Sequence, residues 1–159
     1  LPIVLDRVKE ILIEQGEIGL VYVDVEQFDA IEAEYGWALF DELLCNVGQT
    51  ISSVGAEHYH NAVVVCHRIG GSSFYVFHET KGQDLSEENA KERISADLRL
   101  RLIETTQKRF PNIQSAELGF FVGTARIDYR PQIRLERQIY AGMQTAVNAV
   151  RDAEAQRKK

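Results

Sequence analysis

The sequence predicts a single α/β domain. The chain has 159 residues, of which 45% are hydrophobic and 26% charged, and this is typical of one ordinary globular domain. Helical and strand-like hydrophobic patterns alternate along it. The segment 18–25 (IGLVYVDV) is nearly all apolar until Asp24, which indicates a central strand covered on both faces. We therefore expect helices to pack on both faces of the sheet that contains this strand.

Apolar residues at spacings of three and four predict the helices. The first covers 1–16, with apolar residues from Val4 to Leu12 and an end near Gly16, and we interpret it as a linker helix toward an upstream module. A short helix closes at Gly36, a longer one ends near Gly55, another spans 87–109 before Phe110-Pro111, and the last starts near Ile133 and passes Val150.

Three further segments are predicted to be strands. Segments 62–69 and 73–78 are rich in β-formers and are joined at Gly70-Gly71. They predict a hairpin, because paired glycines tolerate the positive φ angles of a tight turn. Segment 116–127 supplies the remaining strand.

Composition excludes several classes of function. The longest apolar runs fall far short of the roughly 20 residues that cross a bilayer, so no membrane contact is expected. The net charge of −6 argues against a broad nucleic-acid surface. Cys45 and Cys66 form no CxxC pair, which favours a reducing, cytoplasmic setting. The four histidines also lack zinc-site spacing, so no zinc site is predicted.

The ends of the chain indicate a piece of a larger, multidomain protein. The sequence begins without Met at Leu1 and shows no signal-peptide pattern. The charged tail 151–159 has no apolar stripe, so we expect it to be solvated or to lead into a neighbouring domain.

Two blocks of sequence carry a family resemblance. VYVDVEQFDAIEAEYGWALFDELL (21–44) and RIGGSSFYVF (68–77) resemble the GGDEF family of diguanylate cyclases. The matching positions are Asp24, Glu26, Phe28, Ile31, Gly36, Asp41, Glu42, Leu43, Leu44, Arg68, Gly70, Gly71 and Phe74. The resemblance extends over essentially the whole chain. It implies one domain over 1–159, a nucleotidyl-cyclase palm-like sandwich with a mainly antiparallel central sheet and helices on both faces.

The resemblance implies a damaged metal site. Family members join two GTP molecules into cyclic di-GMP with metal ions held by two carboxylates. One is retained as Asp24, beside the carbonyl of Val25, whereas Ser72 and Ser73 stand at the acidic hairpin positions. A neutral hydroxyl does not replace a carboxylate on Mg²⁺. Glu26 shares a strand face with Asp24 and is a conceivable substitute ligand.

The implied nucleotide site is only partly retained. Asp41 matches one guanine-reading acid, whereas Glu32 replaces the guanine-reading Asn and accepts but does not donate hydrogen bonds when ionised. The phosphate-facing Lys of the last helix falls on Arg151 in the register that we prefer, or on Met143 in another. Gly70 and Gly71 are the remaining nucleotide-binding positions that the resemblance implies, although hairpin geometry alone explains both glycines.

Three positions have simpler explanations or have lost the family's residues. The inhibitory product site of the family would fall on Asn61 and Val64, which provide neither the Arg nor the acid, so no such site is expected. Trp37 replaces a polar family residue, and we expect core packing rather than coverage of the guanine space. Asp24 and Asp41 are also compatible with ordinary capping or surface roles.

These residues predict a catalytically inactive GGDEF domain. We expect a regulatory, dimerisation or GTP-sensing module of bacterial cyclic di-GMP signalling, in the cytoplasm or in the cytoplasmic part of a membrane-attached sensor. Its expected partners are GTP, a second copy and a neighbouring EAL or sensory domain, with Mg²⁺ present only if nucleotide is bound. The alternative is a residual diguanylate cyclase that holds its metal through Asp24 and Glu26.

Overall fold

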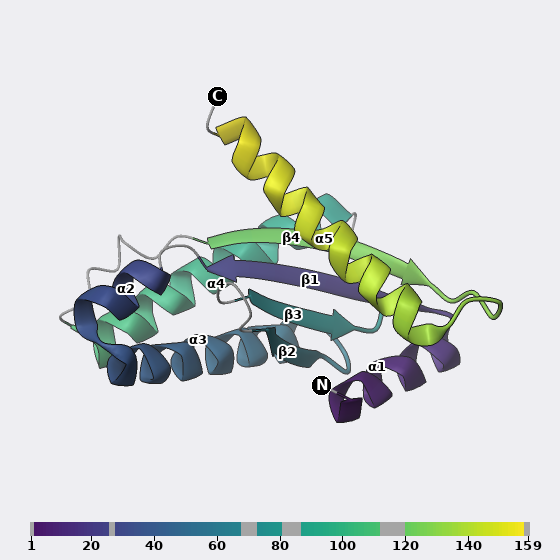
Figure 1. The fold of residues 1–159 in the computed structure, drawn as a ribbon, viewed down its shortest axis with the longest axis horizontal. Helices are drawn as coiled ribbons and strands as arrows, with labels where there is room; N and C mark the ends of the chain where they lie inside the picture. The colour runs from purple at the N-terminus through teal and green to yellow at the C-terminus, as the bar shows by residue number, and fades with distance from the viewer. Residues whose placement is uncertain (1, 26–27, 68–72, 81–86, 112–119, 158–159) are drawn as a thin grey trace.

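A computed structural model of the chain describes residues 2–25, 28–67, 73–80, 87–111 and 120–157. Its elements follow the predicted order (Figure 1): α1 (Pro2–Gln15), β1 (Glu17–Val25), α2 (Phe28–Tyr35), α3 (Trp37–His58), β2 (Val63–His67), β3 (Ser73–His78), α4 (Glu87–Arg109), β4 (Phe120–Asp128) and α5 (Leu135–Arg157). The hairpin turn at Gly70-Gly71 and the predicted strand residues 116–119 lie outside the described residues.

The four strands form one sheet in the order β2-β3-β1-β4. All of its neighbouring strands are antiparallel, so the predicted mainly antiparallel sheet is confirmed. β1 is a central strand, and its residues 18–23 are buried without interruption. Helices pack on both faces of the sheet, as expected for a strand whose residues 18–23 are all buried.

Helices α1 and α5 cover one face of the sheet. Their apolar residues meet alternate residues of the strands in one cluster, which includes Leu5, Val8, Ile11, Leu12, Ile18, Leu20, Phe77, Ile127, Ile139 and Val150. Lys9 of α1 donates a hydrogen bond to Glu136 of α5 over 2.6 Å. The segment predicted to be a linker helix therefore contributes to the core of the domain.

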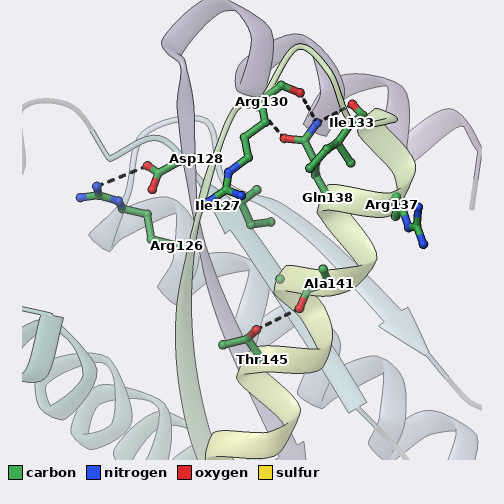
Figure 2. Close-up of a pocket in the computed structure, with 10 residues that line it drawn as sticks. Arg126, Ile127, Asp128, Arg130, Ile133, Arg137, Gln138, Ala141 and Thr145 are labelled. Atoms are coloured by element: carbon green, nitrogen blue, oxygen red, sulfur yellow. Dashed lines mark hydrogen bonds and ion pairs between the residues drawn. The ribbon is translucent and has the colours of Figure 1, made fainter.

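Helix α5 crosses β4 at very short range (Figures 1 and 2). A Cβ atom added at Gly123 of β4 would lie 2.5 Å from the carbonyl oxygen of Ala146. One added at Gly142 of α5 would lie 2.4 Å from side-chain carbons of Ile127. The helix and the strand can approach this closely only because neither position carries a side chain.

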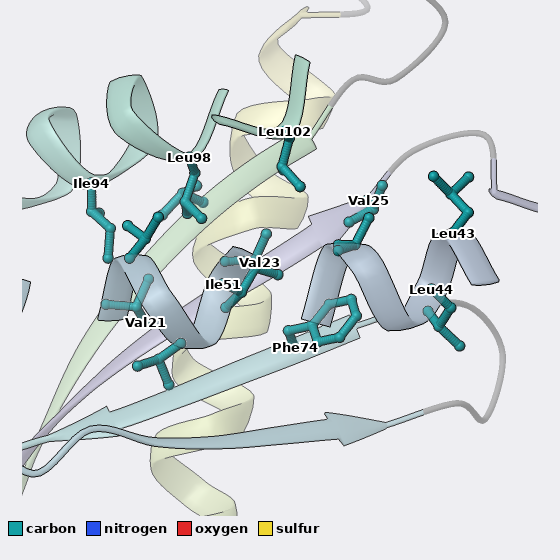
Figure 3. Close-up of a cluster of buried hydrophobic side chains, with 14 of the residues drawn as sticks. Val21, Val23, Val25, Leu43, Leu44, Ile51, Phe74, Ile94, Leu98 and Leu102 are labelled. Atoms are coloured by element: carbon teal, nitrogen blue, oxygen red, sulfur yellow. The ribbon is translucent and has the colours of Figure 1, made fainter. Parts of the chain in front are cut away.

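Helices α3 and α4 cover the opposite face (Figure 3). Residues of α3, α4, β1 and β3 meet there in a second buried cluster, which includes Val21, Val23, Val25, Leu43, Leu44, Ile51, Phe74, Ile94, Leu98 and Leu102. At the rim, the Arg101 guanidinium of α4 contacts the carboxylates of Glu57 and Asp97. The imidazole of His58 lies 2.8 Å from Asp97.

Three element boundaries differ from the prediction. Helix α3 continues past Gly55 to His58, because Gly55 is a packing position: a Cβ there would lie 3.2 Å from Val76. Helix α5 starts at Leu135 rather than near Ile133, which belongs to the preceding turn. The charged tail continues α5 as far as Arg157, and Figure 1 shows its last turns extending beyond the sheet.

Within the described residues, no helix combines the length and the apolar character needed to cross a membrane.

Candidate nucleotide site

A small polar cluster lies where β1 ends. The β1–β3 register places Asp24 opposite Ser73 and Tyr22 opposite Tyr75. Since alternate residues of a strand share a face, all four side chains belong to the α1/α5 face. The hydroxyl groups of Tyr22 and Ser73 are hydrogen-bonded at 3.1 Å, and the rings of Tyr22 and Tyr75 lie 5.1 Å apart.

Helix α5 brings a positive charge to this cluster. Burial raises the pKa of Tyr75, and the nearby Tyr22 and Asp24 raise it further, whereas Arg151 lowers it. Arg151 is exposed, so its guanidinium is available to solvent while acting electrostatically on the strand end. Met143, the alternative position for this cation, is partly buried against apolar residues.

A separate cavity lies between the start of α3 and the end of α4. It has a volume of 510 Å³ and is lined by Asp41, Glu42, Cys45, Arg109 and Phe110. Asp41, the predicted guanine-reading acid, is thus part of a cavity wall. Glu32, its predicted partner, is exposed on α2 and is not among the lining residues.

Comparison with known proteins identifies the fold and the family. The family model for "Diguanylate cyclase, GGDEF domain" matches residues 5–156. The chain belongs to the GGDEF family. It is therefore a domain of the diguanylate cyclase family, the family of cyclic di-GMP signalling. A comparison with curated protein sequences found no significant match.

Several solved structures of diguanylate cyclases and GGDEF domains share the fold. The GGDEF domain of DgcB from Caulobacter crescentus, in complex with c-di-GMP, aligns with a TM-score of 0.60 at 17% identity over 94% of this chain and 81% of that chain. SiaD from Pseudomonas aeruginosa, in complex with its activator SiaC, gives 0.63 at 16% identity over 98% of this chain and 53% of SiaD. The active GGEEF domain of a Vibrio cholerae diguanylate cyclase gives 0.53 at 18% identity over 94% and 85%.

The GGDEF family implies a divalent metal, and the donor set at the strand end fits it poorly. The described residues of this cluster supply one carboxylate, Asp24, beside the neutral hydroxyls of Ser73 and Tyr22. Mg²⁺ prefers several hard oxygen ligands, with carboxylates among them. Elsewhere in the described ranges, no three His, Cys, Asp or Glu side chains gather to hold a metal ion. Val25 ends the buried strand, whereas Glu26, Gly70, Gly71 and Ser72 lie outside the described residues.

The two positions on which the resemblance places the family's product site have structural roles in this chain. Asn61 adopts a positive φ of 52°, and its amide donates a hydrogen bond to Glu79 over 2.6 Å. Val64 is half-buried in β2 and packs against the α3/α4 cluster. At these positions the chain offers an engaged amide and an apolar side chain, neither of which attracts a phosphate.

The expectation that Trp37 packs in the core is wrong. Trp37 is 70% exposed, because the start of α3 lies beyond the carboxyl end of β1, where none of the described strands lies beneath it (Figure 1). Arg109 and Phe110 were missed as cavity residues, since only the tertiary approach of α4 brings them near Asp41. Tyr22 and Tyr75 were detectable, because each precedes or follows a predicted site residue by two positions on its strand.

Proposed function

We propose that this GGDEF domain has lost cyclase activity and acts as a regulatory module that senses GTP. The single observation that carries the proposal is the hairpin sequence Gly-Gly-Ser-Ser-Phe at 70–74, combined with the position of Ser73 directly opposite Asp24. Both acidic positions of the family motif are therefore neutral in this chain.

The chemistry of cyclisation explains why that loss is decisive. Two carboxylates hold the metal that activates the attacking hydroxyl and neutralises phosphate charge in the family. A serine hydroxyl carries no charge at pH 7, and the Ser73 hydroxyl is already bonded to Tyr22. We therefore expect no cyclisation of GTP by this chain.

The remaining residues support nucleotide binding without turnover. Asp41 lines a cavity of 510 Å³, and carboxylates accept hydrogen bonds from the guanine edge through its N–H groups. Arg151 adds a cation near Asp24 and Tyr75, of a type that binds phosphate well. Bound GTP would bias an adjoining domain only through a difference in affinity between two states.

The wider setting is part of the same proposal. We expect a cytoplasmic or membrane-attached bacterial protein in which an EAL or sensory domain, or a second copy, reads the state of this domain. One protein of similar structure, the diguanylate cyclase SiaD, forms a complex with its activator SiaC, which illustrates that a diguanylate cyclase can bind a regulatory partner.

Calorimetric titration of GTP, with and without Mg²⁺, followed by chromatography for cyclic di-GMP, tests the proposal. We expect saturable binding with a Kd in the range of about 1 to 100 μM and no product. Asp41→Asn should weaken binding at least about tenfold because it removes the acceptor charge facing the base. Glu34→Gln, an equal charge change on the exposed surface of α2, should leave binding unchanged.

Two results separate the alternatives. Formation of cyclic di-GMP that disappears in Asp24→Ala and Glu26→Ala would establish the residual cyclase and overturn the proposal. Absence of binding at millimolar GTP, equivalent to no better than about −4 kcal/mol, would leave a scaffold or dimerisation role. Where GTP binds, the Asp41→Asn and Glu34→Gln pair shows whether the cavity beside α3 is involved.

A further inference from the structure

A second cavity lies at the other end of the sheet, between β4 and α5 (Figure 2). It has a volume of 390 Å³, within the range of about 300 to 1,000 Å³ that small-molecule sites occupy. The β1–β4 register pairs Asp24 with Phe121 but Glu17 with Asp128, and Asp128 lines the cavity. The cavity is therefore far from the candidate nucleotide site along the sheet.

The charge of this cavity opposes that of the whole chain. Its lining includes three arginines, Arg126, Arg130 and Arg137, against one carboxylate, Asp128, in a protein whose net charge is −6. Arg126 is neutralised, because it lies 3.4 Å from Glu17 and 3.3 Å from Asp128. Within the described residues, no ion pair involves the guanidinium of Arg130 or Arg137. Two positive charges therefore remain for an external anion.

The backbone that carries Arg130 is held in place before any ligand binds. The buried amide of Gln138 accepts a hydrogen bond from the Arg130 N–H over 2.8 Å and donates to the carbonyls of Arg130 and Ile133 over 2.9 and 2.7 Å (Figure 2). These three hydrogen bonds hold the turn before α5 in one conformation. Because the turn is already ordered, ligand binding has a smaller entropic cost.

The rest of the lining is apolar or weakly polar. Ile127, Ile133, Ala141 and Gly142 form apolar wall, and Thr145 donates its hydroxyl to the carbonyl of Ala141 over 3.0 Å. A free inorganic anion would leave this apolar surface uncovered. An organic anion, with a charged group for the arginines and a less polar body for the wall, would match both parts.

We propose that the cavity between β4 and α5 binds a small organic phosphate through Arg130 and Arg137. Guanidinium groups suit phosphate because their fixed N–H fork donates two parallel hydrogen bonds to its oxygens. The lining is confined to the end of β4, the turn that follows it and the first turns of α5, and this short extent favours a small molecule over an acidic peptide, which would need an extended groove. The site is independent of the proposed GTP site, since it shares no residue with it.

Titration of the full chain with phenyl phosphate, at constant ionic strength, tests this assignment. We expect saturable binding with a Kd below about 1 mM, with amide-resonance shifts in NMR spectra at Gln138, Gly142 and Thr145. Inorganic phosphate should bind more weakly because it lacks the apolar body, and benzoate should bind more weakly because carboxylate offers fewer acceptor oxygens.

Variants locate the site. Arg130→Gln and Arg137→Gln should each weaken phenyl phosphate binding at least about tenfold, as expected for loss of charge-assisted hydrogen bonds. Arg93→Gln removes the same charge from exposed α4 surface and should change nothing. Ala141→Leu fills the cavity from an exposed helix position without altering charge, and it should also abolish binding.

Two outcomes would overturn the proposal. One is the absence of saturable binding by a correctly folded chain at about 10 mM ligand. The other is an equal loss in Arg93→Gln and Arg130→Gln, which would mean that only general electrostatic attraction is present. Because none of these variants touches Asp41 or Arg151, GTP titration of the same proteins distinguishes failure here from failure of the nucleotide proposal.

Discussion

Among single residues, Thr106 has a buried hydroxyl group that makes no hydrogen bond within the described part of the chain. It lies in α4 and is fully buried, and among the described side chains it is the buried polar atom without a hydrogen-bond partner. Thr106→Val keeps the shape and removes the unsatisfied group. We therefore expect the free energy of unfolding to rise by about 1 kcal/mol, measured by urea denaturation followed by circular dichroism.

Thr50→Val is the matched control for that substitution. The Thr50 hydroxyl is also buried in a helix, but it donates to the carbonyl of Asn46 over 2.8 Å. The same exchange should therefore give no gain, or a loss of about 1 kcal/mol. Equal effects at Thr50 and Thr106 would contradict the argument.

His78 gives the fold a pH dependence above the range of the carboxylates. Burial lowers the pKa of His78, opposed in part by its hydrogen bond to the Glu79 carbonyl, and its ring stacks on Tyr59 at 3.6 Å. The unfolded chain therefore binds the His78 proton at a higher pH than the folded chain does. Stability is fully present above the ordinary pKa of 6.5 and falls as pH is lowered through and below that value.

This dependence can be isolated experimentally. Urea midpoints measured from about pH 8 to about pH 5.5 should fall in the unmodified chain. His78→Phe retains an aromatic ring beside Tyr59 but has no proton to bind, so it should lose most of that slope. A slope that is unchanged in His78→Phe would assign the effect to other groups.

At the level of elements, the contact between β4 and α5 depends on Gly123. A methyl group there would meet the backbone carbonyl of Ala146 at 2.5 Å and Val150 at 2.8 Å. Since helix backbone cannot move aside without displacing α5, Gly123→Ala should cost about 1 to 3 kcal/mol. The measurement is again the free energy of unfolding.

Gly48→Ala provides the contrasting exchange in a helix interior. Its added Cβ has Phe74 as its nearest neighbour, at 3.4 Å, and alanine stabilises helices relative to glycine by roughly 0.5 to 1 kcal/mol. We expect Gly48→Ala to be neutral or stabilising. Similar losses at Gly48 and Gly123 would show that glycine content, and not the close approach of α5, sets the cost.

The spacing of apolar residues, together with the Gly and Pro residues that end elements, predicted most of the helices and strands. The end of α4 at Arg109 follows from Phe110-Pro111, since a residue before proline leaves the helical region. The error at Gly55 has a physical cause: a glycine chosen for close packing against Val76 looks in sequence like a helix terminator. Sequence patterns describe local conformation and do not report which glycines face another backbone.

In the candidate site too, local features were predictable from the sequence, whereas tertiary contacts were not. Asp24, Ser73 and Asp41 were placed on the correct elements because a family motif and strand alternation fix them locally. The Arg130 and Arg137 cavity was not predicted, because it requires the approach of β4 to α5. The exposure of Trp37 was also missed, since its hydrophobicity indicated a core position.

For the molecule as a whole, α1 is an integral part of the fold. Ile11 is 1% exposed within the α1/α5 cluster, and Ile11→Ala should cost about 2 to 5 kcal/mol. Ile13 is 51% exposed on the same helix, so Ile13→Ala should stay within about 0.5 kcal/mol. Comparable small effects at both positions, by thermal unfolding, would mean that segment 1–16 is only loosely attached.

The whole domain also carries a built-in optical probe. Trp37 is the single tryptophan of the chain, and it lies at the exposed start of α3, one helical turn before Asp41. Its indole emission therefore reports on one place, without interference from a second fluorophore of its kind. A purine that stacks on this ring would quench the emission, so nucleotide binding beside the start of α3 would be readable in unlabelled protein at concentrations far below those that calorimetry requires.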